Sequence, residues 1–147
     1  MNQKTNQIPE RLREIVAEFE YGEGPEKVEM LLAYSERMPA LPDRLKDGRD
    51  TMDLVEECMT PVYVTAEVID GHMTFYFDVP AESPTVRGFA AIMAEGLSGT
   101  TPREMLTVPG DFFYAMGLEK VLTMQRLNGI AAILAHMKRL AAKALDG

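Results

Sequence analysis

The sequence predicts an α+β fold, in which a small antiparallel sheet packs against helices, and three observations lead to this class. Two β-rich runs, 61–69 and 72–79, are joined by Asp70-Gly71, a dipeptide that favours a two-residue type I′ turn. Helical periodicity precedes and follows this hairpin, so helices and strands are segregated along the chain. The 147 residues, 46% of them hydrophobic and 26% charged, suit one folded domain spanning 1–147.

Two helices are expected before the hairpin. An apolar stripe at helical spacing predicts an amphipathic helix that begins near Pro9. This stripe consists of Leu12, Ile15, Val16 and Phe19. A second helix is expected to begin near Pro25, and the residues predicted to form its buried face are Val28, Leu31, Leu32 and Met38. Segment 38–50, which contains proline, glycine and charged residues, is predicted to be a loop.

The turn fixes the register of the hairpin. With a two-residue turn, every pair on one face is apolar, namely Val68 with Met73, Ala66 with Phe75, Val64 with Phe77 and Val62 with Val79. The other face is mostly polar, which is typical of an antiparallel sheet covered on one side only. Residues 52–55 are expected to add a short strand, so that Cys58 lies in the connection leading into the hairpin.

Helices are also expected after the hairpin. Ser83-Pro84 has the residue types of an N-cap and a first helical position, and an apolar face extends from there to Leu97. Thr101 and Glu104 form a capping box that opens a short helix. A short apolar turn at 111–117 follows, and the final helix is expected to run roughly from Thr123 to Leu145.

Composition excludes several classes of function. A net charge of −8 disfavours nucleic-acid binding, which depends on basic side chains meeting phosphates. No stretch is long and apolar enough to span a bilayer, and the N-terminus lacks a signal-peptide pattern, so a cytoplasmic protein with no membrane partner is expected. With one cysteine and two distant histidines, His72 and His136, neither an internal disulfide nor a metal site is expected.

Cys58 is the residue whose position raises a functional question. A buried cysteine is usually inert, whereas a cysteine in a loop is reachable, and the pattern leaves both interpretations open. The thiol lies beside Glu56, Glu57 and Thr60, and the two carboxylates are expected to raise its pKa. A cysteine protease or thiol peroxidase needs a cationic neighbour instead, so a thiol of this kind would depend on a partner for its chemistry.

Four motifs, taken in order, resemble those of the SufE family of sulfur-acceptor proteins. The family pattern Val-x-Gly-Cys-x-Ser-x-Val-Trp is similar to residues 55–63, except that Glu57 stands where glycine is common. An acid followed by x-Pro-x-Val-Arg-Gly-Leu is matched by Glu82 and "SPTVRGF". The cap at 101–104 follows, and "LTMQRLNG", Leu122 to Gly129, fits the family's Leu-Thr-x-x-Arg-x-Asn-Gly.

The resemblance implies a SufE/NifU-like fold and a function in iron–sulfur cluster assembly. In that function Cys58 accepts a persulfide sulfur from a cysteine desulfurase and passes it to an iron–sulfur scaffold. The protein is then a sulfurtransferase-like carrier, a monomer or weak homodimer, rather than an independent enzyme. No cofactor is expected, because pyridoxal phosphate belongs to the partner. The alternative is an interaction module that activates the desulfurase without carrying sulfur.

The resemblance also assigns roles to residues around Cys58. Arg126, near the start of the last helix, is expected to stabilise a thiolate or persulfide anion. Partner binding or positioning of the loop is expected of a further set, which comprises Glu56, Glu57, Thr60, Glu82 and Arg87. Glu56 and Glu57 are further expected to keep the thiol protonated until a partner docks.

Overall fold

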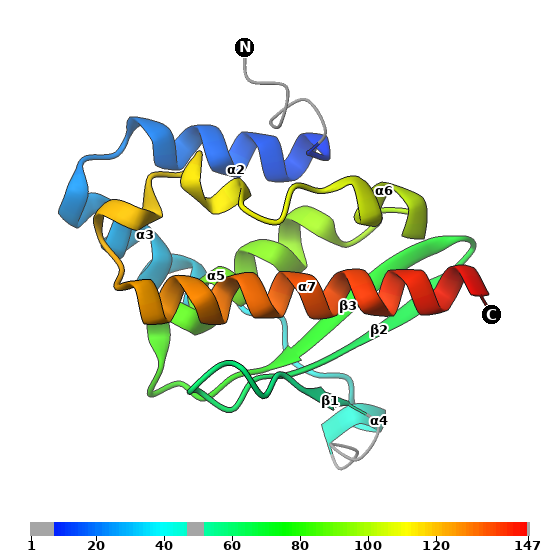
Figure 1. Ribbon diagram of the computed structural model, residues 1–147. Coiled ribbons are helices and arrows are strands. Elements are labelled where there is room, and N and C mark those ends of the chain that lie inside the picture. Colours follow the sequence, from blue (N-terminus) through cyan, green and yellow to red (C-terminus); the bar gives the residue numbers. More distant parts are fainter. Residues whose placement is uncertain (1–7, 47–51, 147) are drawn as a thin grey trace.

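The computed structural model describes residues 8–46 and 52–146, and its architecture is the α+β class that the sequence predicts. The elements in chain order are α2 (Glu10–Tyr21), α3 (Gly24–Glu36), α4 (Asp43–Lys46), β1 (Asp53–Leu54), β2 (Tyr63–Ile69), β3 (His72–Asp78), α5 (Pro84–Leu97), α6 (Pro102–Thr107), the 3₁₀ turns η2 (Phe112–Tyr114) and η3 (Leu118–Lys120), and α7 (Met124–Asp146). The strands form one antiparallel sheet in the order β1-β2-β3, and α7 runs along it (Figure 1).

The hairpin has the predicted register. Val64 faces Phe77, Ala66 faces Phe75 and Val68 faces Met73. The turn residues Asp70 and Gly71 have φ values of 53° and 81°, the left-handed values that a type I′ turn requires. The short strand expected near 52–55 is β1, which pairs with the start of β2. Local turn chemistry and alternation of side chains therefore determined this part of the fold.

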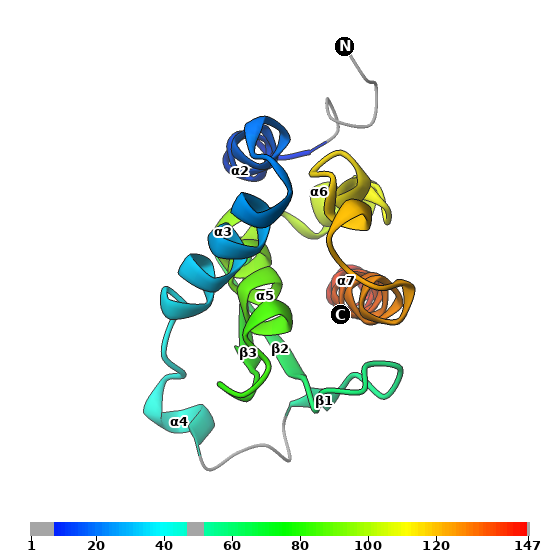
Figure 2. The same cartoon turned by 90° about the vertical axis from the view of Figure 1, so that its left-hand side faces the viewer.

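Helix α5 lies at the centre of the molecule and is buried on nearly every side. Two of its glycines let other helices come close. A Cβ at Gly88 would lie 2.1 Å from the Leu31 carbonyl oxygen of α3, and one at Gly96 would lie 2.9 Å from Leu12 of α2. Figure 2 shows α5 with α3 on one side and α7 on the other. The position of α5 matters for function because its first turn forms one wall of the site described below.

The predicted buried face of α3 is wrong in part. Leu31 is buried, but Leu32 is 38% exposed, and Lys27 is buried in its place. The Lys27 ammonium donates to two backbone carbonyl oxygens. One belongs to Phe19, at the end of α2, and the other to Met116, at 2.9 Å. A lysine is stable there because its buried ammonium is paired with two backbone carbonyl oxygens. Of segment 38–50, predicted to be a loop, residues 47–50 lie outside the described residues, and the described part includes the short helix α4.

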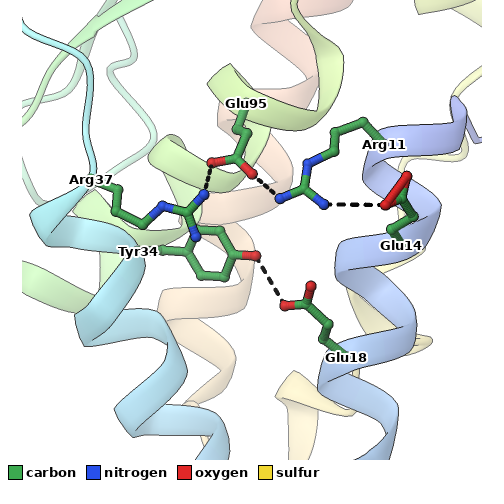
Figure 3. Close-up of polar contacts among 6 residues, drawn as sticks. All are labelled: Arg11, Glu14, Glu18, Tyr34, Arg37 and Glu95. Atoms are coloured by element: carbon green, nitrogen blue, oxygen red, sulfur yellow. Dashed lines mark hydrogen bonds and ion pairs between the residues drawn. The ribbon is translucent and has the colours of Figure 1, made fainter.

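Polar contacts tie α2, α3 and α5 together on the outer side (Figure 3). The Glu95 carboxylate of α5 accepts hydrogen bonds from Arg11 of α2 and, at 2.7 Å, from Arg37 at the end of α3. The Arg37 guanidinium also lies 4.8 Å from the centre of the Tyr34 ring, and the Tyr34 hydroxyl donates to Glu18 at 3.1 Å. Burial, and then the charge of Glu18, raises the pKa of Tyr34. One carboxylate thus links three helices.

Helix α7 packs along the molecule through its apolar side, and Ile130, Ile133 and Met137 are fully buried there. The preceding helix α6 begins with the predicted capping box, in which Thr101 accepts from the Glu104 backbone and the Glu104 carboxylate accepts from the Thr101 backbone. None of the helices within 8–46 and 52–146 has the length and apolarity needed to cross a membrane.

Candidate functional site

The loop that carries Cys58 connects β1 to β2 and is closed at its base. The Val55 N–H donates to the Val62 carbonyl at 2.9 Å, and the Cys58 N–H donates back to the Val55 carbonyl at 3.3 Å. Val55 and Val62 are both fully buried. The apolar core therefore holds the two ends of the loop, while the residues between them remain at the surface.

Two hydrogen bonds connect α7 to the strand that leads into this loop. His136 Nε2 lies 3.0 Å from Asp53 Oδ2, and an Arg139 amino group lies 2.8 Å from His136 Nδ1. Because the guanidinium can only donate, Nδ1 accepts and Nε2 carries the proton donated to Asp53. His136 is thus a structural residue that links α7 to β1.

Cys58 opens into a cleft of about 470 Å³ between this loop, the start of α5 and the start of α7. Its side chain is half-buried and packs against the edge of the core. The cleft is lined by Cys58, Met59, Thr60, Glu82, Ser83, Pro84, Thr85, Val86, Thr123, Gln125, Arg126 and Gly129. Four of these residues carry hydroxyl groups, so the lining of the cleft is rich in hydrogen-bonding groups.

The thiol rests against the second turn of α7. A Cβ built at Gly129 would lie 3.1 Å from Cys58 Sγ and 3.7 Å from both Cα and Cβ of the cysteine. The three nearest atoms to that position all belong to Cys58. Gly129 therefore leaves room for the cysteine where any other residue would place a side chain.

Arg126 and Cys58 line the same cleft, as their expected roles require. The Arg126 guanidinium donates to the Thr85 hydroxyl at 2.8 Å and so reaches from α7 to α5. The loop makes similar contacts, since the Thr60 hydroxyl donates to Ser83 at 3.1 Å and the Gln125 amide lies against the Met59 sulfur. The side chains of three segments thus meet around the thiol.

Burial raises the pKa of the Cys58 thiol, and it is the largest influence on that pKa. A hydrogen bond from the Thr60 backbone and the positive charge of Arg126 act in the opposite direction. The sequence predicted the direction correctly but not the cause. Glu56 and Glu57 are exposed and lie outside the lining of the cleft, whereas the packing of the thiol against α7 removes it from water.

Of the other residues predicted to bind the partner or position the loop, two line the cleft and one does not. Thr60 and Glu82 line the cleft. Arg87 lies outside that lining and donates to the carbonyl oxygens of Ser35, at 3.1 Å, and Val79, at 2.7 Å. Its contacts therefore join α5 to the ends of α3 and β3, and none of them reaches the loop of Cys58.

Sequence reasoning gave Gly129 and Thr85 no role of their own. Gly129 did carry a signal, because a glycine inside a helical pattern costs helix stability and usually has a packing reason. Thr85 carried none, since a threonine in the first turn of a helix is ordinary. Its importance depends on Arg126, which lies 41 residues away in the chain.

The chemistry that this cleft can support depends on a thiol with an arginine and one carboxylate, Glu82, in the same lining. No histidine, aspartate or lysine lines it, and no metal-binding group of three or more His, Cys, Asp or Glu side chains exists in the part of the chain that the structure describes. The cleft can hold a thiolate through Arg126 and the Thr60 backbone, whereas the Glu82 carboxylate, although it lines the cleft, is not among the groups that shift the pKa of Cys58.

The sequence of this chain is similar to those of known proteins. A family model described as "SufE: Fe-S metabolism associated domain" matches residues 13–141. An uncharacterized SufE-like protein of Mycobacterium tuberculosis is 37% identical over 133 residues, which cover 90% of this chain and 92% of that protein. The sulfur acceptor protein CsdE of Escherichia coli is 30% identical over 109 residues, 74% of this chain and 71% of CsdE.

A solved structure has the same fold. The solution structure of a hypothetical protein from Thermus thermophilus superposes with a TM-score of 0.83 at 34% sequence identity. The match covers 95% of this chain and 99% of that protein. Sequence and fold agree over nearly the whole chain, and this protein belongs to the SufE family.

Proposed function

We propose that this protein accepts sulfur from a cysteine desulfurase onto Cys58. The observation that carries the proposal is a half-buried thiol in an open cleft whose lining holds an arginine and no histidine. Such a thiol is reachable, yet its raised pKa leaves it weakly activated in the free protein. The name of CsdE, a sulfur acceptor protein, supports the same chemistry for this family member.

The transfer is an exchange at sulfur. The Cys58 thiolate attacks the terminal sulfur of a persulfide on the desulfurase, so that a new S–S bond forms at Cys58 as the S–S bond of the partner breaks. The partner cysteine leaves as a thiolate and takes up the proton that Cys58 has lost. No external oxidant or reductant is needed. The sulfur then passes by the same exchange to an iron–sulfur scaffold, and pyridoxal chemistry stays with the desulfurase.

Arg126 and the Thr60 backbone favour the anionic forms that this exchange requires. Both lower the pKa of Cys58 against the larger effect of burial. Thr85 accepts a hydrogen bond from Arg126 and so orients the guanidinium within the cleft. The anion is stabilised by one charge and one backbone dipole.

The rim of the cleft is the proposed contact surface for the desulfurase. Glu56, Glu57 and Glu82 are exposed there, and Met59 next to the cysteine is 80% exposed. Methionine adapts its shape to a partner and is enriched at binding surfaces. Docking at this rim would bring the persulfide of the desulfurase to the thiol in the cleft.

Intact-protein mass spectrometry tests the proposal. The protein is incubated with a cognate cysteine desulfurase and free cysteine, and the wild type is compared with Cys58→Ser. The expected result is a gain of one or more sulfur atoms, each about 32 Da, that a thiol reductant reverses and that the variant lacks. A wild type left unmodified by an active desulfurase contradicts the proposal. If Cys58→Ser also stimulated the desulfurase fully, the protein would be an interaction module instead.

A further inference from the structure

We propose that Gly129 is a positioning residue that sets the resting depth of the Cys58 side chain. The absence of a side chain at this position lets the thiol lie against α7, partly withdrawn from solvent. A larger residue would push the thiol outward into the cleft. This inference deepens the proposed function, because it names the residue that keeps the acceptor thiol withdrawn before transfer.

The backbone gives no reason for a glycine at this position. Gly129 lies in the second turn of α7, and among the described residues the positive-φ glycines are Gly71, Gly99 and Gly117. A glycine inside a helix costs about 1 kcal/mol relative to alanine. The reason for glycine is therefore found in its surroundings, and the nearest atoms there are those of Cys58.

The contact differs from those of the two glycines of α5. A Cβ at Gly88 meets helix backbone and one at Gly96 meets a buried leucine, and both are packed inside the core. The neighbour of Gly129 instead belongs to a surface loop with an open cleft beside it. At 3.1 Å the neighbour must give way by a few tenths of an ångström, and the open cleft leaves space for that movement.

Outward movement has two chemical consequences. The thiol becomes more accessible to reagents, and it loses part of the burial that raises its pKa. Both consequences increase reaction of the thiol in the free protein. The withdrawn position therefore protects Cys58 from adventitious oxidants and electrophiles, at the cost of slower attack on a persulfide.

Alkylation of Cys58 by a neutral reagent such as iodoacetamide measures the effect. Rates are recorded against pH for the wild type, Gly129→Ala and Gly129→Val, all with the full chain. We expect the rate at a pH below the thiol pKa to rise by about threefold to tenfold in Gly129→Ala. At such a pH the thiolate fraction rises about tenfold when the pKa falls by one. Gly129→Val should react faster still. The midpoint of the profile should move to lower pH in the same order.

Ala135→Val is the matched control, because it introduces valine at an exposed position of the same helix, away from the cleft. Thermal unfolding shows whether each variant is folded, and Gly129→Ala should match or exceed the wild type since alanine favours a helix. Rates and midpoints like those of the wild type in the folded variants overturn the inference, and so does an equal rise in Ala135→Val. If Gly129→Val fails to fold, Gly129→Ala decides alone.

The outcome is separate from that of the proposed function. No desulfurase takes part in alkylation, so the order of rates holds or fails whether or not the wild type accepts sulfur. A wild type that gains no sulfur while Gly129→Ala alkylates faster would reject the carrier function and keep the positioning role. A wild type that gains sulfur while Gly129→Ala alkylates no faster would keep the carrier function and reject the positioning role.

Discussion

At the scale of single residues, three neighbours set the reactivity of Cys58 in opposite directions. Packing against Gly129 removes the thiol from water and raises its pKa. The Thr60 backbone and the charge of Arg126 favour the thiolate, but by less. The thiol is consequently kept mostly protonated at neutral pH, although the means to stabilise its anion are already in the cleft.

Replacing Arg126 should weaken that anion stabilisation. In Arg126→Ala the loss of a nearby positive charge raises the pKa of Cys58 further, and alkylation at a pH below that pKa should slow by about two- to fivefold. The measurement is the pH dependence of the alkylation rate. Arg126→Lys keeps the charge, and the midpoint of its profile should lie between those of the wild type and Arg126→Ala. The side chain is exposed, so the melting temperature should change little. An unchanged midpoint in Arg126→Ala would contradict the electrostatic role.

At the scale of elements, glycines decide how closely the helices approach. Gly88 and Gly96 lie on α5 and receive α3 and α2 respectively. Their close contacts place the first turn of α5, with Ser83 and Thr85, opposite the start of α7. The shape of the cleft therefore depends on packing that is distant from the cleft itself.

Gly88→Ala is expected to destabilise the fold strongly. The added methyl carbon would lie 2.1 Å from the Leu31 carbonyl oxygen, and helix backbone cannot yield as a side-chain tip can. The free energy of unfolding in urea should fall by about 1 to 3 kcal/mol or more. Gly24→Ala is the control, since nothing lies within 4 Å of its new Cβ, and it should change stability by less than about 1 kcal/mol. Equal effects of the two substitutions would be inconsistent with this packing.

At the scale of the whole molecule, the ionisation of Cys58 is linked to folding. The pKa of the thiol is raised in the folded state, so the folded protein binds this proton more tightly than the unfolded chain. The resulting stabilisation is complete below the ordinary thiol pKa of about 8.5 and is lost as the pH rises through the raised pKa.

Comparison of the wild type with Cys58→Ser isolates this effect. Urea unfolding under reducing conditions gives the free energy of unfolding of both proteins from neutral pH to about pH 10. The difference should be constant below about pH 8.5, and the wild type should lose stability relative to the variant above it. A difference that does not vary with pH would show that the folded and unfolded proteins hold the thiol proton equally.

The features that the sequence predicted depend on local chemistry. Asp70-Gly71 and the alternation around it sufficed for the register of the hairpin, and Thr101 with Glu104 for the start of α6. Lys27 could not be placed in the core, because one of its two acceptors, the Met116 carbonyl, is 89 residues away. Propensity describes neighbours in sequence, and a buried lysine depends on neighbours in space.

The candidate site was predictable to a similar extent. The family motifs predicted Cys58 and Arg126 as site residues, and both line one cleft in the structure. The contact of Gly129 with the thiol and the hydrogen bond from Arg126 to Thr85 arise only when α5, α7 and the loop are packed. Arg87, in contrast, belongs to a family motif but contacts the carbonyl oxygens of Ser35 and Val79.

A single-turnover transfer tests the central claim, that Cys58 accepts sulfur directly from a desulfurase, most directly. The desulfurase is first loaded with persulfide by free cysteine, separated from small molecules, and then mixed with an equimolar amount of this protein. Removing free cysteine and sulfide excludes persulfidation by species in solution. Mass spectrometry follows both proteins over time. The account predicts that sulfur lost by the desulfurase is gained by the peptide containing Cys58, and that Cys58→Ser gains none. Sulfur that stays on the desulfurase, or that reaches Cys58→Ser equally, would contradict it.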